Sequence, residues 1–369
     1  MTESTPSPLP LTVRAVRSIG VALPMTYALG TSRGTMTSAP LLLIDLETEE
    51  GITGRSYVWG YFPGALPAIA KILEEVDRVT KGERLAPLDL WDRLAERFAL
   101  IGVQGIVRMA MAGFDVAAWD ALAQAAGLPL ASLLGARPKP IAAYNSCGLG
   151  LMALGKLADE AEKLLAGGFR AIKLRLGYPT LKDDLAALHA VKKRVGGEVA
   201  VMVDYNQALS LAQARERGRA LDREGIYWLE EPIRHDDYAG NAMLARELET
   251  AIQIGENFSE TAAMAAALAA GAADYVMPDL ERIGGVTGWQ RAAALAATHR
   301  IEMSSHLYPE VSAHLLSATP TCHFLEYVDW ADKILEEPLK IVDGFAMTPE
   351  RPGNGLRWDK KAAEKYRIA

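Results

Sequence analysis

The spacing of hydrophobic and polar positions changes after the first third of the chain. The run LLLIDLETEEGITG predicts two strands joined by a polar turn that contains Gly51. Helical stretches follow, from PGALPAIAKILEEVDRVT through LDLWDRLAERFALIG to GIVRMAMAGFDVAAWDALAQAAG. Strands followed by a block of helices are typical of an α+β domain, which we predict for residues 1–137.

Beyond GARPKP, short apolar runs alternate with amphipathic or Ala-rich helical stretches. Repeated strand–helix units require parallel strands, and six or seven such units favour a closed (β/α) barrel over an open sheet. We therefore predict an α/β fold with a TIM-type barrel at residues 138–335. We expect the C-terminal segment, 336–369, to pack back on the first domain. The runs are AIKLRLG, VAVMVDYN, IYWLEEP, AIQIGEN, YVMPD, IEMSSH and HFLEY.

Ionisable side chains follow six consecutive strands of this predicted barrel. One acidic residue after a strand is often only a helix N-cap, but six in register are expected at one mouth of the barrel, where the active sites of such barrels lie. Three carboxylates converging there cannot all ionise without a cation, and their hard oxygens favour Mg²⁺ over zinc. The six residues, at intervals of 26, 26, 23, 27 and 20, are Asp204, Glu230, Glu256, Asp279, His306 and Glu326.

The strand AIKLRLG carries two positive charges on one face. Alternation places Lys173 and Arg175 on the same side, with Ile172 and Leu174 on the other. Burying two unpaired cations is costly, so an anion is expected on that face. The carboxylate of a substrate held on the metal would supply it.

Composition narrows the possible partners. The 369 residues are 50% hydrophobic, carry a net charge of −7 and include only two cysteines. A mild acidic excess without a basic block argues against nucleic acid, and no apolar run approaches the ~20 residues needed to cross a bilayer. Few cysteines suit a reducing compartment, so we predict a cytoplasmic protein. The start, MTESTPSPLP, is expected to be a disordered lead-in.

Several motifs, taken together in order, resemble those of the enolase superfamily, specifically the mandelate racemase subgroup. They are MVDYNQ, WLEEP, IGEN, MPDLERIGGVTGW, SSHLYPEVSAHLLSATPT and FLE. The likeness covers nearly the whole chain and implies that the first domain is a capping domain. It also implies an Mg²⁺-dependent enzyme that abstracts the α-proton of a 2-hydroxycarboxylate through a metal-stabilised enediolate, and a homo-oligomer, often an octamer.

The resemblance implies roles for nine positions around a small carboxylate substrate. The remaining histidines (His189, His235, His299, His314, His323) are expected to be structural or on the surface. The nine positions comprise three Mg²⁺ ligands (Asp204, Glu230, Glu256), a general base with its carboxylate partner (His306, Asp279), two contacts to the substrate carboxylate, one an amine and one a protonated acid (Lys173, Glu326), and two polar neighbours of substrate and metal (Ser146, Asn206).

One catalytic position departs from the family pattern. Where the family's racemases carry Lys-x-Lys, this chain reads Lys173-Leu174-Arg175. The pKa of a guanidinium group lies above about 12, so only about one arginine in a million is neutral at pH 7. We expect Arg175 to act as a charge clamp or a weak acid and not as an efficient base.

The expected substrate flap, YALGTSRGTMTSAP, also departs from the family pattern. Arg33 stands where mandelate racemase has an apolar residue facing the substrate ring. Arg33 either turns to solvent or points inward, where it would favour a second carboxylate or a polyol. Tyr61, Trp59, Leu100 and Leu307 nevertheless predict a partly apolar wall.

Three readings of function follow from these residues. The first is racemase-like chemistry, favoured by the overall resemblance. The second is dehydration of an acid sugar (an aldonate or aldarate), which needs only one effective base. The third is a non-catalytic acid-binding homologue, which would have no need of the His306–Asp279 pair. A phosphate site at IGGVTG is a weaker possibility, because Gly pairs after strands are common.

Overall fold

The N-terminal domain is a three-stranded antiparallel sheet with helices beside it. The computed structural model describes residues 10–368, so residues 1–9 of the expected lead-in lie outside the described residues. The sheet order is β1-β2-β3; β2 and β3 are the two strands predicted around Gly51, and β1 was not predicted. The elements are β1 (Val13–Thr31), β2 (Gly34–Thr48), β3 (Thr53–Trp59), a 3₁₀ turn (Pro63–Ala65), α1 (Leu66–Thr80), α2 (Pro87–Phe98), α3 (Ile106–Ala125) and α4 (Leu130–Leu133).

Helix α3 joins the two domains. It is buried on nearly all sides, as its mostly apolar, Ala-rich sequence favours, whereas α1 buries one stripe of residues at helical spacing. The sheet packs closely on α3 because β3 has Gly54 there: a Cβ at that position would lie 1.9 Å from the Ala117 carbonyl oxygen. On its other side α3 contacts the barrel, where Asp115 accepts hydrogen bonds from the Thr287 amide and hydroxyl.

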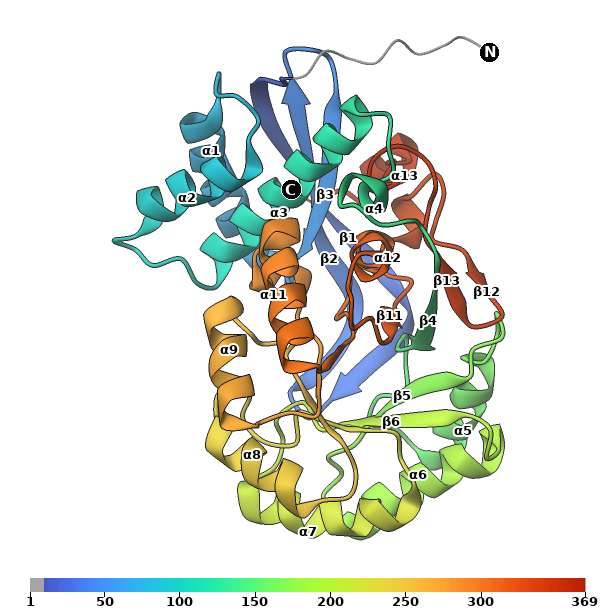
Figure 1. Ribbon diagram of the computed structural model, residues 1–369. Helices are drawn as coiled ribbons and strands as arrows, with labels where there is room; N and C mark the ends of the chain where they lie inside the picture. The colour runs from blue at the N-terminus through green and yellow to red at the C-terminus, as the bar shows by residue number, and fades with distance from the viewer. Residues whose placement is uncertain (1–9, 369) are drawn as a thin grey trace.

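Residues 140–327 form a barrel of eight parallel strands. Consecutive strands β4 to β10 pair in chain order, β11 pairs with β4, and a bridge between Met303 and Cys322 closes the ring. The predicted TIM-type barrel with a capping domain is confirmed (Figure 1). The strands are β4 (Pro140–Asn145), β5 (Ala171–Arg175), β6 (Ala200–Asp204), β7 (Leu229–Glu230), β8 (Ile252–Ile254), β9 (Tyr275–Val276), β10 (Glu302–Met303) and β11 (Leu325–Tyr327).

Helices cover the outside of the barrel between successive strands. Several begin at side-chain caps, such as Thr180 before α6 and Ser210 before α7, where a full capping box forms. The helices are α5 (Leu154–Lys163), α6 (Leu181–Val195), α7 (Leu211–Leu221), α8 (Tyr238–Glu247), α9 (Thr261–Ala270), α10 (Leu280–Ile283), α11 (Gly285–His299) and α12 (Pro309–Ser317), with 3₁₀ turns at Asp222–Glu224 and Asp332–Ile334.

The C-terminal segment contacts both domains. Its hairpin, β12 (Ile341–Val342) and β13 (Phe345–Met347), extends the barrel sheet, because β13 pairs antiparallel with β4. After α13 (Lys360–Lys365), the chain end meets β1, where the Ile368 amide donates to the Gly20 carbonyl at 2.9 Å.

A long hairpin, β1–β2, reaches from the capping domain to the barrel mouth (Figure 1). Its end is tied to the barrel by the Leu151 amide, which donates to the Gly30 carbonyl at 2.8 Å, and by Ser32, whose hydroxyl donates to the Tyr205 carbonyl at 3.4 Å. The hairpin therefore brings the segment around Arg33 to the strand ends.

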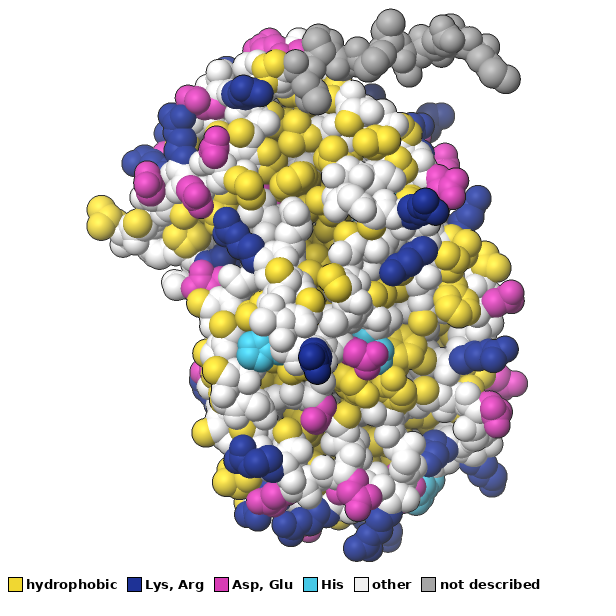
Figure 2. All heavy atoms as spheres, in the orientation of Figure 1, with side chains coloured by type: hydrophobic (Ala, Val, Ile, Leu, Met, Phe, Trp, Pro, Cys, Tyr) yellow, Lys and Arg dark blue, Asp and Glu magenta, His cyan; other side chains and the backbone are white. Residues whose placement is uncertain are grey.

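The visible surface carries interspersed charges of both signs, without a single-sign block (Figure 2). Within the part of the chain that the structure describes, every helix is too short or too polar to span a bilayer.

Candidate active site

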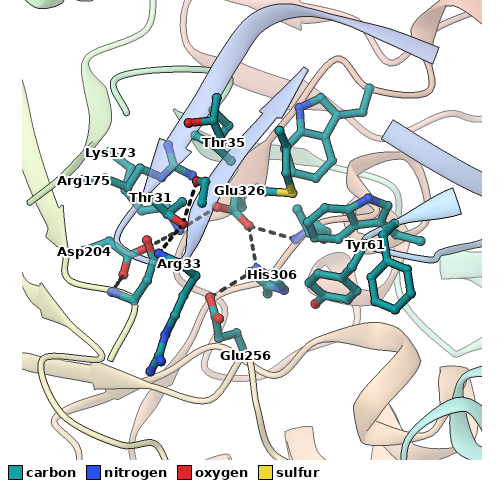
Figure 3. A pocket seen from close by; sticks show the side chains of 18 of the residues that line it. Thr31, Arg33, Thr35, Tyr61, Lys173, Arg175, Asp204, Glu256, His306 and Glu326 are labelled. Atoms are coloured by element: carbon teal, nitrogen blue, oxygen red, sulfur yellow. Dashed lines mark hydrogen bonds and ion pairs between the residues drawn. The ribbon is translucent and has the colours of Figure 1, made fainter. Parts of the chain in front are cut away.

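The barrel mouth and the hairpin enclose a cavity of about 590 Å³. Its floor comes from the C-terminal ends of the barrel strands and its roof from β1, β2 and the loop after β3 (Figure 3). Both domains therefore contribute to one site, and the expected end of the barrel carries it.

Three carboxylates converge on the cavity floor. Asp204 ends β6, Glu230 ends β7 and Glu256 lies two residues beyond β8, and one oxygen from each falls within 4.8 Å of the others. Burial, opposed by Lys173, and the neighbouring carboxylates raise the pKa of Glu230 to about 8. Converging hard oxygens whose negative charges repel one another fit a divalent cation such as Mg²⁺.

Asn206 orients one of these carboxylates. Its amide N–H donates to Asp204 Oδ1 at 2.7 Å and its side-chain Nδ2 donates to Oδ2 at 2.9 Å. Asn206 and Gln207 both have positive φ angles, 46° and 62°, which turn the chain sharply after β6. Asn206 thus lies beside the carboxylate cluster and lines the cavity, as does Tyr61.

Lys173 lies inside the cluster of acids. Its Nζ is 2.7 Å from Glu230, 2.8 Å from Glu326 and 3.6 Å from Asp204, and its side chain is 1% exposed. The strand alternation correctly placed Lys173 on a buried charged face. In the structure, however, its anionic partners are the protein's own carboxylates.

His306 faces the same cluster and is paired behind with Asp279. His306 Nδ1 is 2.7 Å from Asp279 Oδ2, whereas Nε2 is 3.3 Å from Glu256. Asp279 is itself fixed as the N-cap of α10, since its Oδ1 accepts from the Glu281 and Arg282 amides. Burial opposes protonation of the imidazole, but Glu256, Glu326 and Asp279 raise the pKa of His306 to about 9. A cation bound to Glu256 would weaken the largest of these three carboxylate interactions and so lower the pKa of His306.

Glu326 lies between two positively charged groups, Lys173 and His306. Burial would raise its pKa, but Lys173 and His306 overcome that effect and hold the pKa below its usual range. The Leu307 amide also donates to Oε2 at 2.9 Å. In this arrangement nearby positive groups favour the carboxylate, and protonation of Glu326 beside a bound substrate stays a prediction.

Arg175 is buried and donates to neutral groups. Its Nη1 donates to the carbonyls of Ser146 at 3.1 Å and Gly148 at 2.6 Å, and its Nη2 donates to the Ser146 hydroxyl at 2.7 Å. Among residues 10–368, no carboxylate lies within the 4 Å of an ion pair with its guanidinium. Ser146 therefore orients Arg175, and the cation lines the cavity without an anionic partner.

The cavity wall from the capping domain is aromatic. Trp59 stacks on Tyr61 with ring centroids 3.9 Å apart and packs against Trp330 at 4.7 Å. Leu307 also lines the cavity, but Leu100 is fully exposed in the loop after α2 and does not line it. Placing Leu100 in the wall was wrong, because an apolar residue in a loop does not specify where the loop runs.

Arg33 points along the cavity mouth (Figure 3). Its Nη2 donates to the Gln207 carbonyl at 3.1 Å. Within the described residues Arg33, like Arg175, has no carboxylate at ion-pair distance. Arg33 is therefore an exposed residue whose guanidinium is held by a main-chain carbonyl and not by an acid.

Three further polar residues at the site were not predicted from the sequence. Arg282 lines the cavity and donates to the Glu256 carbonyl and to Asn257 and Tyr61. Asn257 donates to Glu256 and to both oxygens of Glu231, which is fully buried. The sequence offered one indication of them: each residue lies within three positions of a predicted metal ligand or of Asp279.

Comparisons with known proteins identify the class of the chain. The N-terminal domain signature of mandelate racemase and muconate lactonizing enzyme matches residues 14–135, and the enolase C-terminal domain-like signature matches residues 156–362. The chain therefore belongs to the mandelate racemase and muconate lactonizing enzyme family of the enolase superfamily, and it is an enzyme of that family, as predicted.

Two relatives of the chain are enzymes named for reactions of sugar acids. L-talarate/galactarate dehydratase of Salmonella typhimurium is 30% identical over 89% of this chain and 82% of its own length. The 3,6-anhydro-alpha-L-galactonate cycloisomerase of Streptomyces coelicolor is 29% identical over 94% of this chain and 97% of its own length. The family thus includes dehydratases and cycloisomerases.

A solved structure from Bradyrhizobium is more similar in sequence. This enolase-superfamily protein, described as complexed with magnesium and mandelic acid, is 39% identical, covers 98% of this chain and 99% of its own chain, and superposes with a TM-score of 0.93. Bound magnesium in this relative confirms the predicted cofactor, Mg²⁺.

Proposed function

We propose that this protein is an Mg²⁺-dependent lyase that removes the α-proton of a 2-hydroxycarboxylate with His306 and then expels a β-oxygen. The observation that carries the proposal is that His306, paired with Asp279, lines the cavity, whereas the position of the family's second lysine base is occupied by Arg175, whose guanidinium is a poor base. A single effective base suits elimination, whereas racemisation needs proton transfer on both faces. Dehydratase relatives support the same reading.

Asp204, Glu230 and Glu256 would hold the magnesium ion. When bound, Mg²⁺ supplies Lewis-acid stabilisation for negative charge developing on the substrate carboxylate. Lys173, at the centre of the cluster, would contact that carboxylate, and Arg175, on the same face of β5, would contribute further fixed positive charge. Each favours the enediolate over the ground state because its charge lies where negative charge grows.

His306 Nε2 would accept the α-proton. In the neutral form of His306, which a cation on Glu256 would favour, Nδ1–H is donated to Asp279 and the lone pair on Nε2 faces the cavity. Breaking the C–H bond leaves its electron pair in the enediolate, and return of that pair expels hydroxide from the β-carbon. Protonated His306 can give its proton to the leaving oxygen, so that water departs and the enol becomes a 2-keto-3-deoxy acid.

Arg33 and the aromatic wall would determine which acids fit. The Arg33 guanidinium at the mouth can bind a distal carboxylate or hydroxyl, whereas Trp59 and Tyr61 offer an apolar face. A matched pair of sugar acids, one with a distal carboxylate and one with a distal CH₂OH, separates these roles. Arg33→Met should raise KM for the diacid about tenfold more than for the monoacid.

Incubation of a panel of acids with enzyme and Mg²⁺ in D₂O tests the proposal by NMR. We expect a 2-keto-3-deoxy acid from one sugar acid, loss of this activity in His306→Asn, and retention in His299→Asn, a matched change of an exposed histidine on α11. Full turnover in His306→Asn would exclude His306 as the base.

Racemisation is the second candidate, because the Bradyrhizobium relative binds mandelic acid. Incubation of each mandelate enantiomer in D₂O distinguishes the two reactions. Exchange of one enantiomer only fits the single base, whereas equal exchange of both with inversion would favour the racemase and assign a proton-transfer role to Arg175.

A further inference from the structure

A column of four side chains runs along one wall of the active-site cavity. The Arg282 guanidinium lies over the Tyr61 ring at 4.9 Å, Tyr61 stacks on Trp59 at 3.9 Å, and Trp59 packs on Trp330 at 4.7 Å. All four line the cavity. Arg282 comes from α10 of the barrel, whereas Tyr61 and Trp59 come from the capping domain, so the column crosses the domain boundary.

The barrel end of the column is attached to a carboxylate of the candidate metal site. Arg282 Nη1 donates to the main-chain carbonyl of Glu256 at 3.1 Å and to the side chain of Asn257. Asn257 in turn donates to Glu256 Oε1 at 3.1 Å. Two connected contacts therefore fix both the backbone and the carboxylate of Glu256.

The other contact of Arg282 is in the capping domain. Its Nη2 donates to the Tyr61 hydroxyl, and its guanidinium makes a cation–π contact with the face of the Tyr61 ring. Tyr61 itself has φ of 60°, so its position depends on surrounding contacts and not on a relaxed backbone. Because guanidinium is planar with donors in a fixed fork, Arg282 can hold Tyr61, Asn257 and Glu256 at once in a way that an ammonium cannot.

We propose that Arg282 is a positioning residue that couples the aromatic wall of the capping domain to the Mg²⁺ ligand Glu256. The inference rests on the proposed metal site but not on the reaction carried out there. It makes metal affinity depend on a contact made by the cap. Groups that orient ligands from outside the coordination sphere typically change metal affinity by about 10–100-fold when removed.

Titration of the full-length protein with Mg²⁺ alone, by calorimetry and without substrate, tests the proposal. We expect Arg282→Met to raise the Kd for Mg²⁺ about 10–100-fold, Arg282→Lys to give an intermediate value, and Tyr61→Phe to raise it about 3–10-fold. The matched control is Arg246→Met, which changes an exposed arginine in the last turn of α8 and should leave the Kd unchanged.

The double variant Tyr61→Phe/Arg282→Met separates coupling from independent effects. If Tyr61 acts through Arg282, the double variant should bind Mg²⁺ as Arg282→Met does. Multiplying effects, or a Tyr61→Phe Kd equal to wild type, would overturn the coupling. Equal Kd values for folded Arg282→Met and Arg246→Met, with folding checked by circular dichroism, would overturn the role of Arg282 altogether. An enzyme that turns over no tested acid but shows these Kd values would refute the proposed reaction and leave this inference standing.

Discussion

Replacing Asp279 by asparagine removes one charge from the site while keeping its shape. Asp279 Oδ1 accepts from the Glu281 amide at 2.8 Å and the Arg282 amide at 3.1 Å, and Oδ2 pairs with His306 Nδ1 at 2.7 Å. In Asp279→Asn the amide oxygen must remain on the two backbone N–H groups, so its NH₂ group turns to His306. That NH₂ donates to Nδ1 and places the imidazole proton on Nε2, the atom that should accept the substrate proton.

The cost of restoring the productive tautomer can be worked from these contacts. It would break the new Nδ2–H···Nδ1 bond and bring two donors together, and each unsatisfied buried group costs about 1–3 kcal/mol. The two donors together cost about 2–6 kcal/mol, and the middle of that interval corresponds to a rate reduction of ~10²–10⁴, since each 1.4 kcal/mol is tenfold. This range equals the usual contribution of a general base. Folding should change little, because the helix cap survives.

Deuterium exchange at the α-carbon measures the effect on the acid found by the panel screen. Asp279→Asn should lose ~10²–10⁴ in exchange rate with a melting temperature close to that of wild type. Asp279→Ala should also lose activity, because Nδ1–H loses its acceptor, and should lose about 1 kcal/mol of stability, because it removes the N-cap of α10. An Asp279→Asn enzyme that exchanges within tenfold of wild type would refute the tautomer argument.

Three other outcomes are expected. Excess Mg²⁺ at 100 times its Kd should stabilise the wild type by about 2.7 kcal/mol in thermal unfolding, and Asp204→Asn should remove this gain; an equal gain in the variant would exclude Asp204 as a ligand. Arg175→Lys should lower the free energy of unfolding in urea by about 1–3 kcal/mol, since an ammonium cannot reach both loop carbonyls and the Ser146 hydroxyl; unchanged stability would show that these bonds are not needed. Burial lowers the pKa of His314 to about 4. The folding stability that the buried neutral imidazole contributes is therefore present above pH 6.5 and lost as the pH falls toward 4. Wild type should therefore lose about 2 kcal/mol more stability than His314→Gln between pH 7 and pH 5, and parallel losses would contradict the assignment.

The barrel and its acidic mouth were predictable because both depend on local repetition. Each strand–helix unit has a near-constant length, so residues that end successive strands, such as Asp204 and Glu230, must lie at one end of the ring. His306 and Asp279 follow the same rule. Strand alternation likewise placed Lys173 and Arg175 inside.

What could not be predicted depends on contacts between segments distant in sequence. Lys173 meets Glu230 and Glu326 across the barrel, and this contact favours the charged form of Glu326. The proposed positioning role of Arg282 depends on its hydrogen bond to Tyr61, 221 residues away in sequence. Leu100 illustrates the opposite error, since its apolar side chain suggested a wall and the loop carries it to the surface.

The left-handed backbone of Asn206 and Gln207, which begins two residues after the proposed metal ligand Asp204, limits how far this enzyme can be made more robust. Glycine would relax each position by removing the clash of the Cβ, yet it would also delete the amide group of Asn206 that aims Asp204. A screen for heat-resistant variants is therefore expected to find glycines here among its inactive survivors. Thermal stability and catalytic activity therefore make opposite demands on these two residues.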